Sequence, residues 1–449
     1  MIVVFAMHTA QNDHNPVTPL AVTNWRDIRR KFGIKEKNRR GNMYIIGQTG
    51  TGKSTLIANM VISDMEQGNG LALIDPHGDL AQTVLRYVPQ RRISDVIYFN
   101  ATDLEYPIAF NPLLQVPRDK RYLIASGLIS VFKKIWPEFW GPRMEHILRH
   151  SLLTLLDCPE STLLDLPRLL TESDFRREMF HYVTQEAVRR FWTDEFDKYA
   201  AWLKSEATAP ILNKVGQFLT SIPLRNIVGQ SQNTFDLRRV MDEGKILIVN
   251  LSKGQIGEDT CALLGAMLVT EIQLAALSRA DVEEHKRRPF YLSVDEAQVF
   301  ITSAVADMLS ESRKYGLAVT AANQFSAQLD EGVRSAILGN VGTLIAFRVG
   351  VEDADLFAQE FYPVFSRSDL VNIPNHHIYL KLMIDGVSSV PFSATTLPLP
   401  QKGCSFVDQI MSMSRAKFAN QQRTVDNATI KAKQEPLSPT SKQGSLFRH

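Results

Sequence analysis

The stretch MYIIGQTGTGKSTLI, residues 43–57, decides the fold. It begins with a short apolar run typical of a buried strand, and from Lys53 to about Gln67 the apolar residues have the spacing of a helix. Between them, Gly47 to Thr55 matches G-x-x-x-x-G-K-[ST] in full. A strand, a glycine-rich turn and a helix in this order predict a loop that binds the phosphates of a nucleotide.

The residue types of this loop explain its expected chemistry. Its glycines let backbone N–H groups turn toward the β- and γ-phosphates, aided by the positive end of the helix dipole. Lys53 would add a charge-assisted contact to the terminal phosphates, and the Ser54 hydroxyl would bind Mg²⁺. We therefore predict that ATP and Mg²⁺ bind to the whole loop, which consists of Gly47, Gln48, Thr49, Gly50, Thr51, Gly52, Lys53, Ser54 and Thr55.

The second half of such a site is an acidic residue at the end of a neighbouring strand. The run FYLSVDE, residues 290–296, ends in Asp295 and Glu296. Asp295 would hold the magnesium through water, and Glu296 would orient or deprotonate the attacking water. Gln324 ends the next run, LAVTAANQ, and its amide would reach the γ-phosphate or the water if the two strands are neighbours.

Two arginines are candidates for completing the site. Arg313 lies in ESRKYG, between the acidic pair and Gln324. A helix there would turn Arg313 away from its own nucleotide, so in a ring it would enter the neighbouring subunit's site as an arginine finger. Arg348, in AFRVG, is a weaker candidate for the same task.

Strand and helix signals alternate over residues 43–112 and again from residue 245. Runs that are apolar throughout, with helices between them, predict an α/β fold whose mainly parallel sheet carries helices on both faces. Together with the phosphate loop, this arrangement resembles a RecA-like P-loop NTPase core. Between these parts the apolar spacing is helical and strand-like runs are missing. The expected domains are an arm with a basic segment (1–40), the core (41–117 and 241–395), an all-helical insertion (118–240) and a basic disordered tail (396–449).

The composition of the 449 residues is that of an ordinary globular protein, with 44% hydrophobic and 22% charged residues. The net charge is only +2, so a nucleic-acid surface must be a local patch. Residues 26–40 carry eight Lys/Arg against Asp27 and Glu36, which indicates either a solvated helix and loop or a contact surface for phosphates. The tail is a second candidate for DNA contact. We see no run of roughly 18 to 20 apolar residues that would span a bilayer, and expect a cytoplasmic protein.

Two further motifs have simple interpretations. LSKGQ, residues 251–255, resembles the signature of ABC transporters, but it closes a strand here instead of opening a helix. In DPHGD, the side chains of Asp75, His77 and Asp79 alternate on a loop with no fourth ligand, so we expect an ordered loop rather than a metal site. Asp75 would end the strand beside the phosphate loop.

Several segments together resemble the HerA/FtsK superfamily of DNA-pumping ATPases. Within it, the chain is similar to the soluble motor region of type IV secretion coupling proteins of the TraG/TraD type. The similarity covers roughly residues 40 to 395, and besides the phosphate loop it rests on LALIDPHGDLAQTVL, KILIVNLSKGQIGED, YLSVDEAQVF, SRKYGLAVTAANQ and IYLKLMIDG.

This resemblance implies a DNA-stimulated ATPase that works as a homo-hexamer, with Arg313 acting in trans and Gln324 sensing the γ-phosphate. The motor would pump single- or double-stranded DNA, without sequence preference, in conjugation or type IV secretion. Its partners would be relaxosome or secretion proteins. Coupling proteins usually carry N-terminal transmembrane helices, which we do not find, so this motor would be free in the cytoplasm or recruited to the inner membrane by partners.

Two other functions fit the same motifs. The protein could be a nucleotide-gated docking platform that recruits a relaxosome or an effector protein. It could also be a motor partnered with a separate nuclease in DNA repair or phage defence, since no nuclease motif is visible. All of these functions need Lys53 and Glu296, so the motifs do not separate them.

Overall fold

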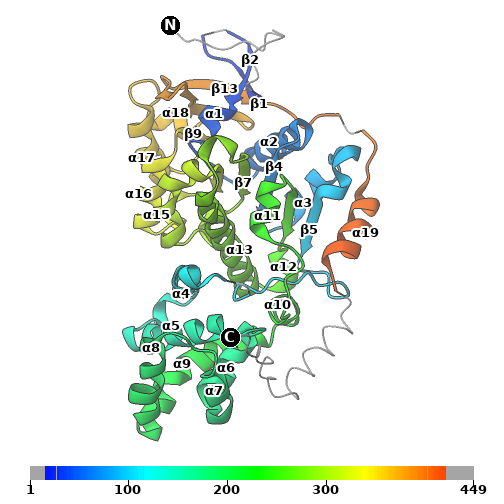
Figure 1. The fold of residues 1–449 in the computed structure, drawn as a ribbon. Coiled ribbons are helices and arrows are strands. Elements are labelled where there is room, and N and C mark those ends of the chain that lie inside the picture. Colours follow the sequence, from blue (N-terminus) through cyan, green and yellow to red (C-terminus); the bar gives the residue numbers. More distant parts are fainter. Residues whose placement is uncertain (1–15, 27, 115, 402, 421–449) are drawn as a thin grey trace.

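The computed structural model describes residues 16–26, 28–114, 116–401 and 403–420. Its principal strands are β1 (Val17–Thr23), β2 (Lys31–Lys35), β3 (Met43–Ile46), β4 (Gly70–Asp75), β5 (Val96–Asn100), β6 (Ile246–Asn250), β7 (Phe290–Val294), β8 (Leu317–Asn323), β9 (Thr343–Ala346), β10 (His377–Lys381) and β13 (Phe392–Thr396). In the described chain they form one sheet of eleven strands in the order β2-β1-β13-β10-β9-β3-β8-β7-β4-β6-β5 (Figure 1). From β9 to β5 the strands run parallel, and β10, β13, β1 and β2 continue the sheet antiparallel. The short strands β11 (Met383–Ile384) and β12 (Val387–Ser388) pair separately.

Helices cover both faces of the sheet. Tyr44 and Ile46 point into one hydrophobic core, and Met43 and Ile45 point into the other. The first core includes residues of α13 (Glu258–Ser278), α14 (Ala297–Phe300), α15 (Ser303–Ser312) and α17 (Val351–Phe361). The second includes residues of α2 (Lys53–Gln67), α3 (Asp79–Leu85) and α19 (Val407–Phe418). The predicted α/β fold with a two-sided, mainly parallel sheet is confirmed.

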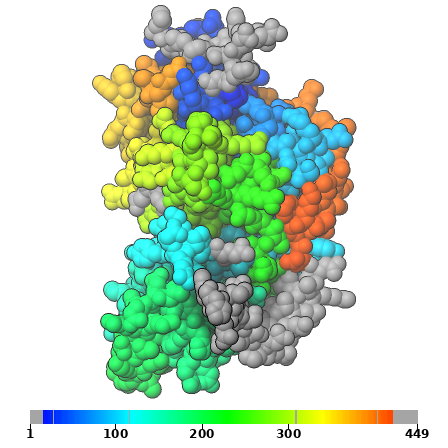
Figure 2. Space-filling view, in the orientation of Figure 1, coloured from blue at the N-terminus to red at the C-terminus, as the bar shows by residue number. Residues whose placement is uncertain are grey.

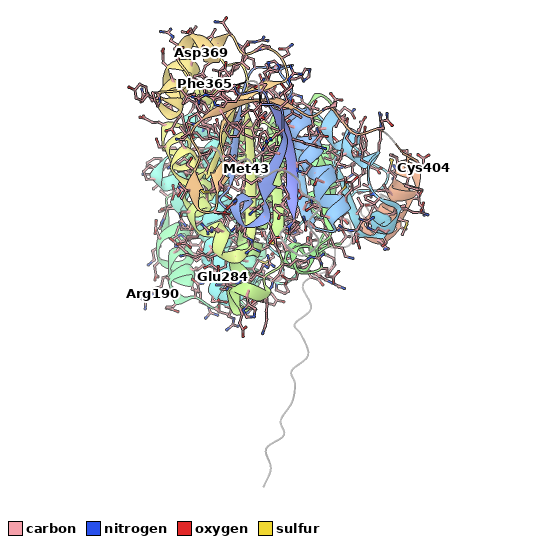
Figure 3. All side chains as sticks on the ribbon, turned by 90° about the horizontal axis from the view of Figure 1, so that it is seen from above. Met43, Arg190, Glu284, Phe365, Asp369 and Cys404 are labelled. Carbon is pink, nitrogen blue, oxygen red and sulfur yellow. The ribbon has the colours of Figure 1, made fainter. Side chains whose placement is uncertain are left out.

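The central strands lie in the middle of the molecule when it is viewed from above (Figure 3). In this view Met43, on β3, lies well inside, whereas Phe365 and Asp369 lie at one edge and Cys404 at another (Figure 3). The remaining core helices are α1 (Glu36–Arg39), α11 (Leu237–Asp242), α12 (Lys253–Ile256), α16 (Glu331–Asn340) and α18 (Arg367–Val371).

A helical lobe lies below the sheet (Figures 1 and 2). Its helices are α4 (Arg121–Ile135), α5 (Pro142–Asp157), α6 (Leu166–Thr171), α7 (Ser173–Met179), α8 (Glu186–Arg190), α9 (Ala201–Leu219) and α10 (Ile222–Val228). No strand occurs among the described residues between β5 and β6. The lobe joins the core through α4, which packs on α13. Whether the lobe is a domain of its own stays a prediction.

The N-terminal segment corrects one expectation. We expect residues 1–40 to be an arm with a basic segment, but Val17–Thr23 is β1, a strand of the sheet paired antiparallel with β13 and β2. The sequence did not predict this strand because Pro19, like any proline, cannot donate a ladder hydrogen bond. The structure accommodates Pro19 at a register shift between Pro19 and Ala21, where such a residue is tolerated.

The C-terminal segment corrects a second expectation. The tail was predicted to be disordered from residue 396, but Val407–Phe418 forms α19 beside β5. The fully buried Ile410 anchors this helix, and the backbone N–H of Tyr98 on β5 donates a hydrogen bond to Ser414 Oγ. The helix therefore covers an edge strand, which explains why a mainly polar sequence folds there. The prediction for residues 421–449 lies outside the described residues.

The apolar helix α13 corrects a third expectation, that no segment is long and apolar enough to span a bilayer. The 24 residues Glu258–Asp281 are long and apolar enough to cross a membrane. However, 72% of this helix's most apolar stretch is buried inside the protein. The length and apolar character of α13 are those of a core helix between the sheet and α4.

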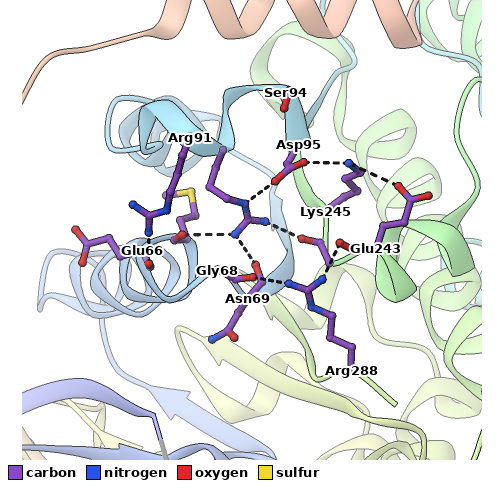
Figure 4. A network of polar contacts seen from close by, with 12 residues as sticks. Glu66, Gly68, Asn69, Arg91, Ser94, Asp95, Glu243, Lys245 and Arg288 are labelled. Atoms are coloured by element: carbon purple, nitrogen blue, oxygen red, sulfur yellow. Dashed lines mark hydrogen bonds and ion pairs between the residues drawn. The ribbon is translucent and has the colours of Figure 1, made fainter. Parts of the chain in front are cut away.

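The amino ends of the parallel strands are tied together by polar contacts (Figure 4). Arg92 Nε lies 2.7 Å from Asp95 Oδ2, and Arg92 Nη2 donates to the carbonyl of Gly244 at 2.7 Å. Lys245 Nζ approaches the other oxygen of Asp95 at 3.0 Å, and Arg288 donates to backbone carbonyls of the same loops. These side chains hold together the loops that lead into the strands at this edge of the sheet.

Part of the basic segment, residues 26–40, lies in secondary structure or forms ion pairs. It forms β2 and α1 instead of the expected helix and loop. Lys37 pairs with Asp385, Arg40 pairs with Glu36, and Arg39 is buried. The exposed cations that remain are Arg26, Arg29, Arg30 and Lys31.

We expect Arg39→Met to lower the free energy of unfolding by about 3–5 kcal/mol. Arg39 holds Asp64 in a bidentate pair at 2.6 and 2.9 Å, and both side chains are only 1% exposed, so the variant leaves a buried carboxylate without its partner. Urea denaturation measures the loss. The matched control Arg40→Met breaks a more exposed pair and should lose less than about 1 kcal/mol. Equal losses in the two variants would contradict the prediction.

Candidate active site

The carboxyl ends of the parallel strands bring the predicted site residues to one edge of the sheet. β3 leads into the glycine-rich loop, β8 ends before Gln324, and β7 ends before Asp295. The order of strands differs from the expectation. β8 lies between β3 and β7, so the acidic strand is not the direct neighbour of β3, and β4 with Asp75 lies beyond β7. Gln324 consequently stands between the loop and the acidic pair.

The glycine-rich loop has a backbone that requires glycine. Gly52 has φ 120°, and a Cβ at this position would lie 2.9 Å from Nδ1 of His376. Gly50 has φ 77°, and a Cβ there would meet no atom within 4 Å, so this side of the loop is open. The backbone N–H of His376 donates to the carbonyl of Thr51 at 2.8 Å. Because His376 directly precedes β10, this bond attaches the loop to the sheet. The open, rigid loop fits a bound phosphate chain.

Lys53 lies buried over this loop. Its Nζ donates to the carbonyls of Gly47 at 2.5 Å and Gln48 at 3.1 Å. Burial lowers the pKa of the Lys53 ammonium, and the nearby carboxylates of Asp295 and Glu296 oppose the shift. The ammonium is thus held beside the loop, where a terminal phosphate would replace the carbonyls as its partner.

The two predicted metal ligands meet. Ser54 Oγ donates to Asp295 Oδ2 at 3.4 Å, although 241 residues separate them in the chain. Burial raises the pKa of Asp295 to about 6, with smaller contributions from Glu296 and Asp75, while Lys53 lowers it. A hydroxyl and a carboxylate beside a phosphate loop form a donor set that fits Mg²⁺.

Glu296 adopts an unusual backbone conformation. With φ 49° and ψ 52° it is left-handed, and it is only 7% exposed. Such conformations are rare outside glycine and cluster at functional sites. Its carboxylate accepts a hydrogen bond from Gln324 Nε2 at 2.6 Å and another from Gln298 Nε2 at 2.7 Å. The sequence singled out Gln324 but not Gln298, whose only signal is its position two residues after the acidic pair.

The family model of the type IV secretion-system coupling protein DNA-binding domain matches residues 31–362. The chain belongs to this family. The match covers most of the sequence and confirms the resemblance found from the motifs. No curated protein sequence is significantly similar to this coupling protein.

Solved structures agree with this fold. The plasmid coupling protein TrwB in complex with GDPNP superimposes with a TM-score of 0.60 at 18% identity, and covers 88% of this coupling protein and 92% of TrwB. VirB4 of Thermoanaerobacter pseudethanolicus gives a TM-score of 0.55 at 15% identity, and covers 87% of this chain and 99% of VirB4. Both share the arrangement of sheet and helices described above.

The two candidate arginines of this coupling protein lie in different places. Arg313 is exposed and precedes β8, whereas Gln324 follows the other end of the same strand. A strand of seven residues spans about 23 Å, so Arg313 cannot reach the loop of its own subunit. Arg348 does reach it, because its Nε donates to Gln48 Oε1 at 3.3 Å. The role of each arginine stays a prediction.

The DPHGD loop of this coupling protein has a structural explanation. The carboxylate of Asp75 accepts hydrogen bonds from the backbone N–H groups of His77 and Ala81, both at 2.9 Å. These bonds order the turn into α3. Across the described residues no cluster of three or more His, Cys, Asp or Glu side chains could hold a metal ion.

Proposed function

We propose that this coupling protein is an ATP-driven DNA translocase that pumps DNA in conjugation or type IV secretion. The observation that carries the proposal is the single sheet edge that brings together Lys53, the Ser54–Asp295 pair and the Glu296–Gln324 pair. Structures of TrwB have been solved with ADP and Mg²⁺ and with a non-hydrolysable ATP analogue. The same ligands suit the groups at this edge.

Each side chain has a role in hydrolysis. Lys53 would leave the loop carbonyls and donate to the terminal phosphates, and Ser54 and Asp295 would hold the metal ion. Bound Mg²⁺ would neutralise charge that develops on the phosphate oxygens. Glu296 accepts a proton from the attacking water, and Gln324 keeps one amide hydrogen free for the γ-phosphate while the other binds Glu296.

We propose a homo-hexameric ring in which Arg313 completes the neighbour's site. Support comes from the position of Arg313 at the amino end of β8, exposed and remote from its own loop. Release of the cleaved phosphate after hydrolysis would remove the negative charge that attracts this guanidinium and so weaken one contact between subunits. Repeated around the ring, this change would move the subunits, and the DNA held between them, in steps.

The DNA contact is expected to be electrostatic. Candidate groups are the exposed cations Arg26, Arg29, Arg30 and Lys31 around the β1–β2 hairpin. Such contacts read the phosphate backbone, so binding should ignore sequence and weaken steeply with salt. We propose that this motor is cytoplasmic, either free or recruited to the inner membrane by secretion or relaxosome proteins.

The test is ATP hydrolysis by the full chain with and without single- and double-stranded DNA at low salt. We expect stimulation by DNA, and displacement of a third strand from a triplex during hydrolysis. Hydrolysis without triplex displacement would favour a docking platform that recruits proteins through a nucleotide-gated surface. Absence of any hydrolysis would reject both the motor and the gated platform.

Mg²⁺-dependent nucleotide binding should weaken below pH about 6. The Asp295 carboxyl, with its pKa raised to about 6 by burial, is protonated below that pH, and the metal must then displace one proton. We expect affinity for Mg–ADP to fall about tenfold per pH unit there, measured by calorimetry from pH 5 to 8. Asp295→Asn is the control, because the nucleotide's own titration is common to both proteins. If both proteins have the same pH slope, Asp295 does not bind the metal.

A further inference from the structure

Four side chains from two strand ends form a continuous chain of hydrogen bonds at the site. Asn323 Nδ2 donates to Gln298 Oε1 at 2.7 Å, Gln298 Nε2 donates to Glu296 Oε2 at 2.7 Å, and Gln324 Nε2 donates to Glu296 Oε1 at 2.6 Å. Each oxygen of the Glu296 carboxylate therefore has its own amide. The function proposed above uses Glu296 and Gln324 but gives no role to Gln298 or Asn323.

We infer that Gln298 is a positioning residue for Glu296, and that Asn323 fixes the orientation of Gln298. The inference rests on the proposed function, because it concerns the group that accepts the proton from water. Gln298 contacts Glu296 and not the nucleotide loop in any hydrogen bond of the described residues. Its effect on the reaction must therefore pass through the carboxylate.

The direction of the hydrogen bonds supports this role. A glutamine amide can present either its oxygen or its NH₂ group, and an oxygen facing a carboxylate is repelled. The donor on Asn323 occupies the oxygen of Gln298 and leaves the NH₂ group of Gln298 toward Glu296. Asn323 is itself fully buried at the end of β8, and its backbone carbonyl accepts a hydrogen bond from the N–H of Gly47 at 3.2 Å, while its side-chain Oδ1 has no hydrogen-bond partner among the described residues. The side chain that donates to Gln298 is thus carried by a rigid strand end.

Glu296 needs such support because its backbone does not provide it. The residue is left-handed and lies between the end of β7 and the four-residue helix α14. Each carboxylate oxygen has two lone pairs, so one amide per oxygen still leaves room for a water molecule. The two amides therefore fix the carboxylate without blocking it. Misplacing a reacting group by about 1 Å can cost on the order of 100-fold in rate.

The variant Gln298→Leu has nearly the same size but donates no hydrogen bond. In the full chain we expect kcat for DNA-stimulated ATP hydrolysis to fall about 10- to 100-fold, with the affinity for a non-hydrolysable ATP analogue changed less than about twofold. Gln298→Met is the second variant if the first is poorly folded. Gln90→Leu, at an exposed position outside the site, is the matched control and should hydrolyse ATP like the wild type.

A second background separates positioning from a structural role. In Glu296→Gln the group to be positioned is gone, so adding Gln298→Leu should lower the residual rate no further. Asn323→Ala should lower kcat like Gln298→Leu, and the two losses should not add. Wild-type kcat in Gln298→Leu, an equal loss of analogue affinity, or a further loss in the Glu296→Gln background would overturn the inference. If the wild type itself does not hydrolyse ATP, the proposed function fails first, and the inference fails with it.

Discussion

Glu296→Gln is expected to lower steady-state ATP hydrolysis by about 10²- to 10⁴-fold and to leave ATP binding intact. Glutamine has the shape of glutamate, but its neutral amide cannot take a proton from water. The loop around Lys53 and the Ser54–Asp295 pair do not depend on the carboxylate for their own hydrogen bonds. Phosphate release measures the first effect, and calorimetry with Mg–ATP measures the second.

Two controls define the result for Glu296. Lys53→Ala should lose binding together with hydrolysis, because its ammonium is the charge at the terminal phosphates. Glu311→Gln replaces an exposed carboxylate on α15 and should behave like the wild type. If Glu296→Gln hydrolyses ATP at the wild-type rate, another group is the base, and the assignment of the acidic pair is wrong.

Arg313→Ala is expected to lower hydrolysis by about 10³- to 10⁵-fold, the range known for arginine fingers, without loss of nucleotide binding. The physical reason is the position of Arg313 at the edge of the sheet opposite its own loop. Its guanidinium can then act only on nucleotide held by another subunit. The neighbouring variant Lys314→Ala, also at an exposed position, is the control and should keep most of the activity.

Mixing two inactive variants tests whether Arg313 acts in trans. Arg313→Ala subunits keep Glu296, and Glu296→Gln subunits keep Arg313. In a ring with head-to-tail contacts, a 1:1 mixture forms an intact site at about a quarter of the interfaces. We therefore expect the mixture to regain about a quarter of wild-type hydrolysis. A mixture as inactive as its components would contradict an intersubunit site.

Local signals predicted much of the molecule. The helix expected from Lys53 to about Gln67 is α2 with the same bounds, because loop, dipole and apolar spacing all lie within one short segment. The strand that ends in the acidic pair was equally visible as an apolar run. These features need no knowledge of distant parts of the chain, and parallel strands then carry their polar ends to one edge.

What the sequence did not reveal depends on distant contacts. The insertion of β8 between β3 and β7 reflects the order of crossovers, which leaves no mark in any one strand. β1 was missed because Pro19 is acceptable only where the partner strand allows a register shift. Gln298 and Asn323 are ordinary polar residues in the sequence. Only the 2.7 Å contacts from Asn323 to Gln298 and from Gln298 to Glu296 connect them to the site.

The strand β8 has a mechanical consequence. All seven of its residues are buried, and it carries Gln324 at one end and leads from Arg313 at the other. In the proposed ring, Gln324 senses the γ-phosphate of its own subunit, and Arg313 acts on the nucleotide of the next subunit. The two residues therefore lie at opposite ends of one rigid strand. A shift of this strand along its axis would transmit the state of one nucleotide site to the neighbouring one.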